Sequence, residues 1–398
     1  MITTVSSRIP MLTTASDTFA TFMFKECKVF KHIISCLLLI SATSALAAEK
    51  PTLTVYTYDS FAADWGPGPA IKQAFEAECD CQLKFVALED GVSLLNRLRM
   101  EGKNSQADVI LGLDNNLVQA AEQTGLFTPS QVDTRNLTLP EPWQNKTFVP
   151  YDYGYFAFVY NKEKLKNPPK SLHELISSKE PWKVIYQDPR TSTPGLGLML
   201  WMQKVYGDQA PQAWQQLAQK TVTVTKGWSE AYGLFLKGEA DLVLSYTTSP
   251  AYHLIAEKNN NYAAADFSEG HYLQVEVAGQ LAASKQPELA QRFMQFIVTP
   301  AFQNHIPTGN WMYPVIKMDL PPGSRHWPCH KQRCNLMLKT WRITAVNGFR
   351  HGNPPSAVNR ALAMAGVAGR WADCRGRLIG VRRYLAPCAH SRLAKCLA

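Results

Sequence analysis

Strand-like and helix-like patterns alternate along the central part of this 398-residue chain, and this order restricts its fold more than any other feature. Residues 53–58 alternate apolar and polar side chains and are rich in β-branched and aromatic residues, which predicts a strand. Residues 65–79 combine early prolines with apolar residues at helical spacing, which predicts a helix. Strands over residues 82–87 and 108–112 and a helix over residues 93–100 continue the order. Such alternation predicts an α/β fold with a parallel, doubly wound sheet.

A long apolar and aromatic run over residues 148–160 interrupts this order. It is unusually long for one edge strand, so we expect the chain to cross there into a second lobe. Residues 272–277 are expected to return the chain to the first lobe, where residues 287–297 form a helix. Within the second lobe we expect strands over residues 184–186 and 241–245, and helices over residues 195–205, 212–217 and 229–237. Ligands of open α/β sheets bind outside the carboxyl ends of strands, so two lobes predict a ligand cleft between them.

The expected domain organisation is two lobes followed by an unusual tail. Lobe 1 comprises residues 48–150 and 279–317, and lobe 2 comprises residues 151–278. Residues 318–398 hold fourteen Lys and Arg against two acidic residues, whereas residues 1–317 hold 27 basic and 30 acidic residues. We expect the tail to be the product of a shifted reading frame. A nucleic-acid-binding appendage would also explain its charge, but no basic and aromatic module accompanies it, so no nucleic-acid partner is expected.

An export signal is predicted over residues 23–47. A basic segment precedes an apolar run over residues 33–40, and small residues stand at the cleavage positions before Ala47. The apolar run is too short for a membrane-spanning helix, which needs about 20 residues. Residues 1–22 are polar and precede the position where a signal should begin, so we expect them to be a non-native upstream extension. We therefore expect cleavage after Ala47 and a periplasmic protein.

The chemistry-bearing residues of the central region are sparse. Cys79 and Cys81 could close a very small disulfide loop in an oxidising compartment, and two free thiols are the alternative that the sequence leaves open. Nucleophile elbows, phosphate-binding loops and complete dinucleotide motifs are missing from the sequence. The central histidines are isolated, and the ligand-like His and Cys spacing of residues 326–334 lies in the anomalous tail. We expect no metal and no cofactor.

Aromatic and acidic side chains recur where predicted strands end or helices begin. Trp65, Trp228 and Tyr252 occupy such positions and together would form a slot for a flat cation. Aromatic faces attract cations by about 0.5–2 kcal/mol each when desolvated. Asp59 and Asp90 would supply the negative charge that a cation needs. Core packing of the aromatic residues and ordinary turn chemistry for the two acids are the alternatives.

Hydroxyl-bearing residues indicate a separate subsite. Ser192 and Thr193 precede Pro194, which predicts a helix start whose free amide groups favour an anion. The stretch from Tyr246 to Ser249 adds more hydroxyl groups at a neighbouring strand end. We expect a phosphate subsite here, and a simple helix cap without a ligand is the alternative. A cation slot beside an anion subsite suits a phosphorylated thiazolium.

Five segments carry a resemblance to a known family: residues 55–61, 87–92, 187–195, 226–230 and 245–250. They resemble the thiamine-binding group of periplasmic solute-binding proteins that serve bacterial ABC importers, and the likeness runs over about residues 51–317. It implies a two-lobed periplasmic-binding-protein fold of class II type, with two crossover segments. It also implies binding of thiamine, thiamine monophosphate and thiamine diphosphate, and partnership with a transporter permease and its ATPase. We expect the protein to be a monomer.

Carried over by position, the resemblance implies ligand contacts from residues of four loops: Asp90, Gly91, Ser192, Thr193, Trp228, Tyr246, Thr247, Thr248 and Ser249. We add Asp59, Trp65, Tyr252 and Trp311 as further candidates because of their places on loops facing the predicted cleft. A ferric-ion or other anion-binding protein of the same fold is an alternative, with Tyr246 and Tyr252 as ligands. A hydrolase or transferase acting on thiamine phosphates is another. We expect a binding protein and no enzyme.

Overall fold

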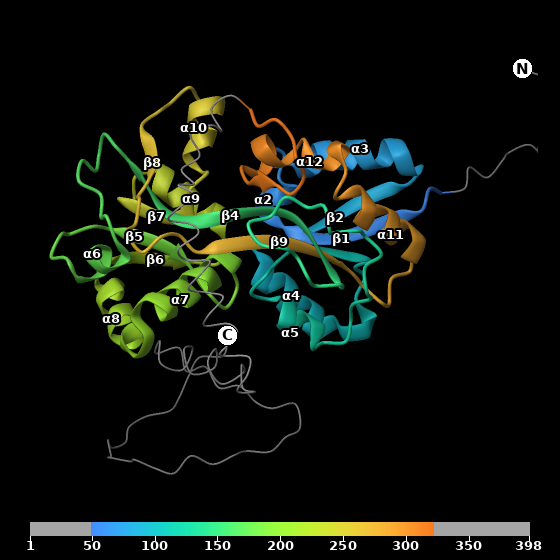
Figure 1. Cartoon of the computed structure of the whole chain (residues 1–398), viewed down its shortest axis with the longest axis horizontal. Coiled ribbons are helices and arrows are strands. Elements are labelled where there is room, and N and C mark those ends of the chain that lie inside the picture. Colours follow the sequence, from blue (N-terminus) through green and yellow to red (C-terminus); the bar gives the residue numbers. More distant parts are fainter. Residues whose placement is uncertain (1–48, 322–398) are drawn as a thin grey trace, which may run out of the picture. The chain divides into compact units, whose positions relative to one another are not determined.

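The computed structural model describes residues 49–321, in which a continuous path of paired strands joins two lobes (Figure 1). The strand order is β2-β1-β3-β9-β4-β7-β5-β6, and β8 and β10 also pair with β4. The two-lobed α/β architecture expected from the sequence is confirmed. The predicted upstream extension and signal segment, and all of the basic tail beyond residue 321, lie outside the described residues.

Lobe 1 contains three parallel strands, with helices on both faces (Figure 1). The strands are β1 (Thr52–Tyr58), β2 (Gln82–Leu88) and β3 (Val109–Asp114). The helices α3 (Gly68–Cys79), α11 (Pro287–Phe296) and α12 (Pro300–Gln303) share one apolar core, and α4 (Gly91–Glu101) and α5 (Val118–Glu122) share another. In α3, residues Ile71, Phe75 and Cys79 are buried at intervals of one helical turn, as the apolar spacing predicts. Helix α2 (Asp59–Ala62), the short turns Gly102–Asn104 and Ile306–Asn310, and β10 (Tyr313–Pro314) complete this lobe.

Lobe 2 repeats the arrangement with three further parallel strands. They are β5 (Val184–Gln187), β6 (Thr221–Thr225) and β7 (Leu242–Tyr246). The helices α6 (Leu172–Ser177), α7 (Thr193–Tyr206) and α8 (Ala210–Lys220) pack around one core, and α9 (Trp228–Leu236) packs on another. Helix α10 (Pro250–Ala256), strand β8 (Tyr262–Ala264) and the turn Gly207–Gln209 complete it. Each lobe therefore presents its strand ends and helix starts at one edge.

Strands β4 (Phe148–Asn161) and β9 (Leu273–Gln280) connect the lobes and are both visible crossing between them in Figure 1. The first half of β4 pairs antiparallel with β9, and its second half pairs antiparallel with β7. The apolar run predicted to cross between lobes is thus a single strand that belongs to both. Hydrogen bonding continues along β4 from β9 to β7 without a break, so the strands of the two lobes are joined in one sheet.

Several element boundaries differ from those predicted. The helix expected from residue 65 begins at Gly68, because Pro67 occupies its N-cap position. The helix expected from residue 93 begins at Gly91, and its N-cap residue is Asp90. Strand β6 was not predicted, although its Thr-Val-Thr-Val-Thr sequence alternates as an edge strand should. Helix ends depend on capping contacts that apolar spacing alone does not reveal.

Cys79 and Cys81 form a disulfide, which decides between the two alternatives that the sequence left open. Cys79 ends α3, Cys81 precedes β2, and their Cα atoms lie 5.1 Å apart. Replacing both residues with alanine is expected to lower the free energy of unfolding by about 1–2 kcal/mol, because the closed loop is very short and removes little entropy from the unfolded chain. Urea unfolding followed by circular dichroism would measure the change. Reducing the wild-type protein should reproduce it and leave the double variant unaffected; equal stability of all samples would contradict the prediction.

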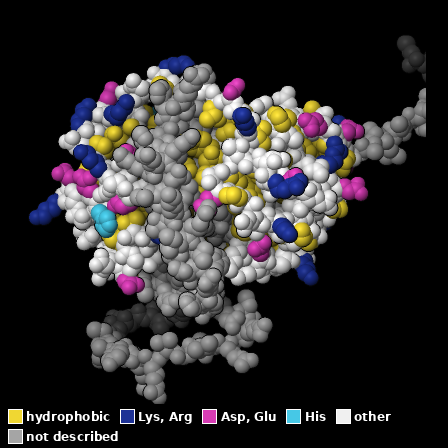
Figure 2. Space-filling model, viewed as in Figure 1, with side chains coloured by type: hydrophobic (Ala, Val, Ile, Leu, Met, Phe, Trp, Pro, Cys, Tyr) yellow, Lys and Arg dark blue, Asp and Glu magenta, His cyan; other side chains and the backbone are white. Residues whose placement is uncertain are grey.

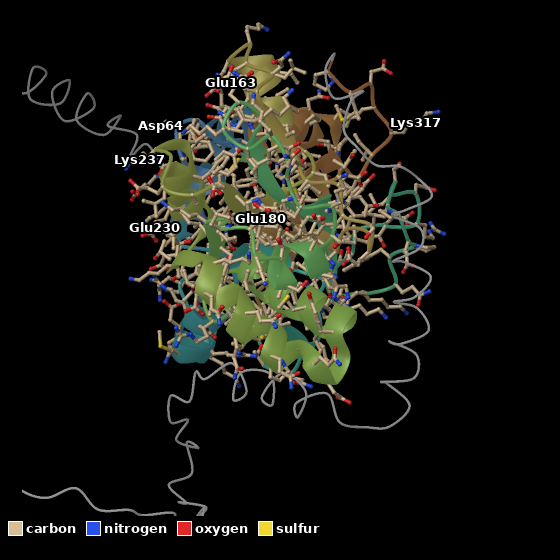
Figure 3. All side chains as sticks on the ribbon, turned by 90° about the vertical axis from the view of Figure 1, so that its left-hand side faces the viewer. Asp64, Glu163, Glu180, Glu230, Lys237 and Lys317 are labelled. Carbon is tan, nitrogen blue, oxygen red and sulfur yellow. A yellow bond between two sulfur atoms is a disulfide. The ribbon has the colours of Figure 1, made fainter. Side chains whose placement is uncertain are left out.

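The surface of the described part has mixed charge. On the face shown in Figure 2, Lys and Arg side chains are interspersed with Asp and Glu. The labelled residues of Figure 3, among them Glu163, Glu180 and Lys317, are exposed and lie at separate places on the outside. No helix within residues 49–321 is both long and apolar enough to span a membrane.

Candidate functional site

A cavity of about 290 Å³ lies where the two lobes meet, near the low end of the volumes typical of small-molecule sites. Its walls come from the end of β1, the starts of α4, α7 and α9, the end of β7, helix α10, strand β9 and the turn Ile306–Asn310. These are the strand ends and helix starts at which the sequence predicts ligand contacts. Eight of the candidate residues line it: Trp65, Asp90, Thr193, Trp228, Tyr246, Ser249, Tyr252 and Trp311.

Five candidate residues do not line the cavity. Gly91 and Ser192 lie directly behind it, next to Asp90 and Thr193. Thr247 and Thr248 are buried, and their hydroxyl groups have no hydrogen-bond partner among the described residues. Asp59 accepts a 2.9 Å hydrogen bond from the hydroxyl of Ser229, a residue that lines the cavity, and so joins the lobes beside it. The structure therefore separates residues that can touch a ligand from residues that hold the walls.

Aromatic rings form much of the cavity wall. Trp228 stacks on Tyr232 with ring centres 4.9 Å apart, and its indole N–H donates to Ser245 Oγ at 2.8 Å. Trp65 lies 6.4 Å from Trp228, and 59% of its surface is exposed. A ring so exposed beside another aromatic residue leaves one face free for a flat ligand.

Tyr252 and Trp311 form a second aromatic pair of the wall, with ring centres 5.4 Å apart. Trp311 has a φ of 56°, in the left-handed region that residues other than glycine rarely adopt. It directly follows a π-helical turn, Ile306–Asn310. Positive φ and π-helical turns both occur preferentially at functional sites, so the backbone supports a ligand role for this residue.

A buried histidine supports the aromatic wall from behind. His253 on α10 lies 2.9 Å from the hydroxyl of Tyr232 through Nε2, and 2.6 Å from the carboxylate of Glu257 through Nδ1. Burial lowers the pKa of His253, while Glu257 opposes that shift. His253 therefore has a packing role and connects α10 to the Tyr232 ring under Trp228.

Asp90 links the lobes inside the site. Its carboxylate accepts hydrogen bonds from the hydroxyl of Ser192 at 2.8 Å, and from the amide and hydroxyl of Thr193 at 3.2 and 2.9 Å. It also accepts from the amide of Gly91 at 2.7 Å and caps α4. Burial raises the pKa of Asp90, although these hydrogen bonds act in the opposite direction. The start of α7, where we expected a phosphate, thus holds a carboxylate of the protein itself.

Gly91 is required for this close approach. A Cβ atom on it would lie 2.2 Å from the carbonyl oxygen of Gly112 and 2.6 Å from Cγ2 of Thr193. Gly112 belongs to the same lobe as Gly91, whereas Thr193 belongs to the opposite lobe. Backbone hydrogen bonding between Ser93 and Thr191, at 2.9 Å, continues the same interface.

A row of acidic residues crosses the sheet at the floor of the cavity. Asp114, Glu276 and Asp152 stand in register on β3, β9 and β4. All three are buried, and Glu276 lines the cavity. Burial raises the pKa of Asp114 to about 6 and that of Asp152 to about 7. Burial and the charge of Asp152 raise the pKa of Glu276 well above its usual range.

Hydrogen bonds tie this row to neighbouring polar groups. The amide of Asn310 donates to Asp152 at 2.6 Å and to Glu276 at 3.3 Å, and the hydroxyl of Tyr58 donates to Glu276 at 2.9 Å. On the other side, Gln274 donates to Asp114 at 3.3 Å. The floor of the cavity is therefore polar and acidic, and its walls are aromatic. Among the described residues, no Lys, Arg or His lines it.

Comparison with known proteins identifies the family. Residues 62–304 match the family described as bacterial extracellular solute-binding protein. The chain belongs to this family. A curated relative of this solute-binding protein, the thiamine-binding periplasmic protein of Escherichia coli K12, is 75% identical over 288 residues, which cover 72% of this chain and 88% of the relative. The protein of the same name from Brucella melitensis is 54% identical, covering 75% and 89%.

Solved structures agree with this assignment. A periplasmic thiamin binding protein is 76% identical to this solute-binding protein, with a TM-score of 0.69, and the match covers 70% of this chain and 87% of that one. Iron-bound HitA from Pseudomonas aeruginosa has a TM-score of 0.59 at 24% identity, covering 68% and 89%, and shares the fold alone. The relatives are solute-binding proteins of the periplasm. The chain is therefore a periplasmic solute-binding protein and not an enzyme.

Sequence reasoning missed the acidic residues at the floor of the cavity in this solute-binding protein. Glu276, Asp152, Tyr58 and Asn310 were not among the candidates, although all four belong to one hydrogen-bonded group. A signal existed, because Asp152 is the one acidic residue in the otherwise apolar and aromatic run of β4. A charged residue in a buried strand is costly unless it is paired or functional.

Proposed function

We propose that this protein binds thiamine in the periplasm and delivers it to an ABC importer. The observation that carries the proposal is the lining of the cavity, in which aromatic rings surround two carboxyl groups and no basic residue is present among the described residues. Thiamine has a permanently cationic thiazolium ring and a flat aminopyrimidine ring, which suit such walls. The names of relatives that are 75% and 54% identical support the same ligand.

The phosphorylated forms of thiamine belong to the same proposal. Their phosphate would lie near Ser249, which lines the cavity, and near the buried hydroxyl groups of Thr247 and Thr248, which have no partner among the described residues. The carboxylate of Asp90 already occupies the start of α7 and would repel a phosphate there. We therefore expect thiamine to bind at least as tightly as its phosphates. Calorimetric titration with thiamine, thiamine monophosphate and thiamine diphosphate tests this order, and tighter binding of either phosphate would contradict it.

The transport role includes partners and processing. We propose that the protein is a monomer, that its signal is cleaved after Ala47, and that a permease and its ATPase receive the ligand. Hinge closure along β4 and β9 would trap the ligand between the lobes. Amino-terminal sequencing of the exported protein tests the cleavage site, and a start other than Ala48 would overturn it.

The ferric-ion alternative has no specific support in the site. The hydroxyl of Tyr246 donates to Gln274 at 2.7 Å, and burial, together with nearby carboxyl charges, raises its pKa well above the ordinary value. A tyrosine must lose its proton to bind iron strongly, which this environment opposes. Within residues 49–321, no cluster of three His, Cys, Asp or Glu side chains is arranged to hold a metal ion.

Replacing Trp228 with leucine tests the thiamine site directly. We expect thiamine binding to weaken about tenfold, because the loss of one desolvated aromatic face corresponds to about 1–2 kcal/mol. Isothermal titration calorimetry would measure the dissociation constant. The same substitution at Trp214, which packs against Tyr186 outside the cavity, serves as the matched control and should change the constant less than about twofold. Equal effects of the two substitutions would contradict the proposed site.

A further inference from the structure

The buried acidic row places like charges on neighbouring strands. Asp152 on β4 and Glu276 on β9 are direct cross-strand neighbours, and like charges opposite each other destabilise a sheet. None of the ion pairs formed by the described residues includes Asp90, Asp114, Asp152 or Glu276. The row therefore lacks the basic partners that normally compensate buried carboxylates.

A shared proton makes this arrangement tolerable without a basic partner. The carboxyl groups of Asp152 and Glu276 are buried on directly opposed strand positions, and both accept from the one side-chain amide of Asn310. Such close carboxyl groups favour a state in which one of them keeps its proton. Asp152 Oδ1 has no N–H or O–H donor among the described residues, and Asp152 Oδ2 accepts from Asn310. Two buried carboxyl groups at opposed strand positions cannot both ionise without a large energetic cost.

The surroundings of Glu276 favour replacement of that proton by another positive charge. The titratable groups that act on Glu276 from the neighbouring elements are carboxyl or phenol groups: Asp90 at the start of α4, Asp114 on β3, Asp152 and Tyr151 on β4, Tyr58 on β1 and Tyr246 on β7. All of them are neutral or negative. A cation in the cavity would therefore be the nearest positive charge to Glu276.

We propose that cation binding in this cavity is coupled to release of the proton shared by Asp152 and Glu276. The positive charge of the ligand replaces the proton at the floor of the cavity. Both carboxyl groups of the pair are then ionised. The inference rests on the proposed function, because it requires a ligand with a permanent positive charge such as the thiazolium ring. No covalent step is involved, and the proton leaves to solvent as the ligand enters.

The sign of the pH dependence follows from this exchange. Lowering the pH keeps the proton on the pair and opposes binding, whereas raising the pH removes the proton and favours binding. One released proton corresponds to a change of about tenfold in affinity per pH unit within the titration range. Since the pKa of Asp152 is raised to about 7 and that of Glu276 is raised well above its ordinary value, the range includes neutral pH.

The experiment is calorimetric titration of the wild-type protein with thiamine between about pH 6 and pH 8. We expect the affinity to rise at least about tenfold across this range. Titration at pH 7 in two buffers of different ionisation enthalpy should show release of close to one proton per ligand. This measurement needs no variant and so does not depend on the folding of one.

Variants identify the groups responsible. Glu276→Gln and Asp152→Asn each remove one carboxyl group of the pair, so each should reduce the change in affinity across the range to less than about twofold. Asp64→Asn removes one exposed carboxylate beside Trp65 and should keep the wild-type dependence (Figure 3). Any protonation of the ligand itself affects all samples equally, so it cancels when the pH dependences of the variants are compared.

The outcomes separate this inference from the proposed function. Absence of thiamine binding at every pH would overturn both. Tight binding with constant affinity and no proton release would overturn the inference alone. An unchanged pH dependence in both Glu276→Gln and Asp152→Asn, with melting curves like that of the wild type, would also overturn it.

Discussion

Replacing Asp90 with alanine is expected to weaken thiamine binding at least about 100-fold. The carboxylate lines the cavity and accepts four hydrogen bonds, from Gly91, Ser192 and twice from Thr193. Its removal leaves buried donors without an acceptor, at about 1–3 kcal/mol each, and removes negative charge that faces the cationic ligand. A loss of about 2.7 kcal/mol already corresponds to 100-fold in affinity. Isothermal titration calorimetry at neutral pH would measure it.

Asp59→Ala is the matched control for this substitution. Asp59 also accepts a hydrogen bond across the lobes, from Ser229 at 2.9 Å, but the contact is exposed and Asp59 itself does not line the cavity. Exposed polar contacts contribute little, so we expect less than about a threefold change in affinity. A similar loss in both variants would show that linking the lobes matters, and that the place of Asp90 inside the cavity does not.

Replacing Trp201 with alanine is expected to lower the free energy of unfolding by about 3–5 kcal/mol. Trp201 on α7 is fully buried in the core of lobe 2 and packs against Phe267 and His271. Its removal leaves a large cavity beneath the helix that carries Thr193 into the site. Urea unfolding followed by circular dichroism would measure the change.

Two further variants control for the chemistry of the tryptophan ring. The indole N–H of Trp201 has no hydrogen-bond partner among the described residues, so Trp201→Phe loses apolar volume but no bond, and should cost less than about half as much as alanine. Trp65→Ala removes an exposed ring and should change the stability by less than about 0.5 kcal/mol. A small effect of Trp201→Ala would contradict the assignment of this residue to the core.

Local patterns were sufficient to predict most of the elements. Alternation along β1 and helical spacing along α3 show which face of each element is buried. These apolar patterns can be read directly from the sequence. Ser192 and Pro194 likewise indicated the start of α7, because capping is a contact between near neighbours in the chain. Positions at strand ends and helix starts indicated several of the candidates that line the cavity, since strand ends of a parallel sheet meet at one edge. The resemblance to the family implied Asp90, Thr193, Trp228, Tyr246 and Ser249 as well.

The contacts that define the chemistry of the site are long-range and could not be predicted in this way. Asp90 meets Ser192 at a separation of 102 residues, so no local pattern shows that the expected anion subsite is already satisfied. The pairing of Asp152 with Glu276 depends on the register of β4 and β9. A shift of one residue in that register would have placed the two carboxyl groups on opposite faces of the sheet.

The place of β9 in the sheet has a consequence for maturation after export. Strand β3 has β1 and β9 as its neighbours, and residues of β3 and β9 such as Asp114 and Gln274 are 160 positions apart. If the amino terminus crosses the membrane first, most of lobe 2 arrives before β9 does. During that interval β3 presents an unpaired edge, which is a site for misassociation between newly exported chains. Chaperone protection should therefore matter most until residues 273–280 have crossed, and a pause in translocation just before them would be the most damaging.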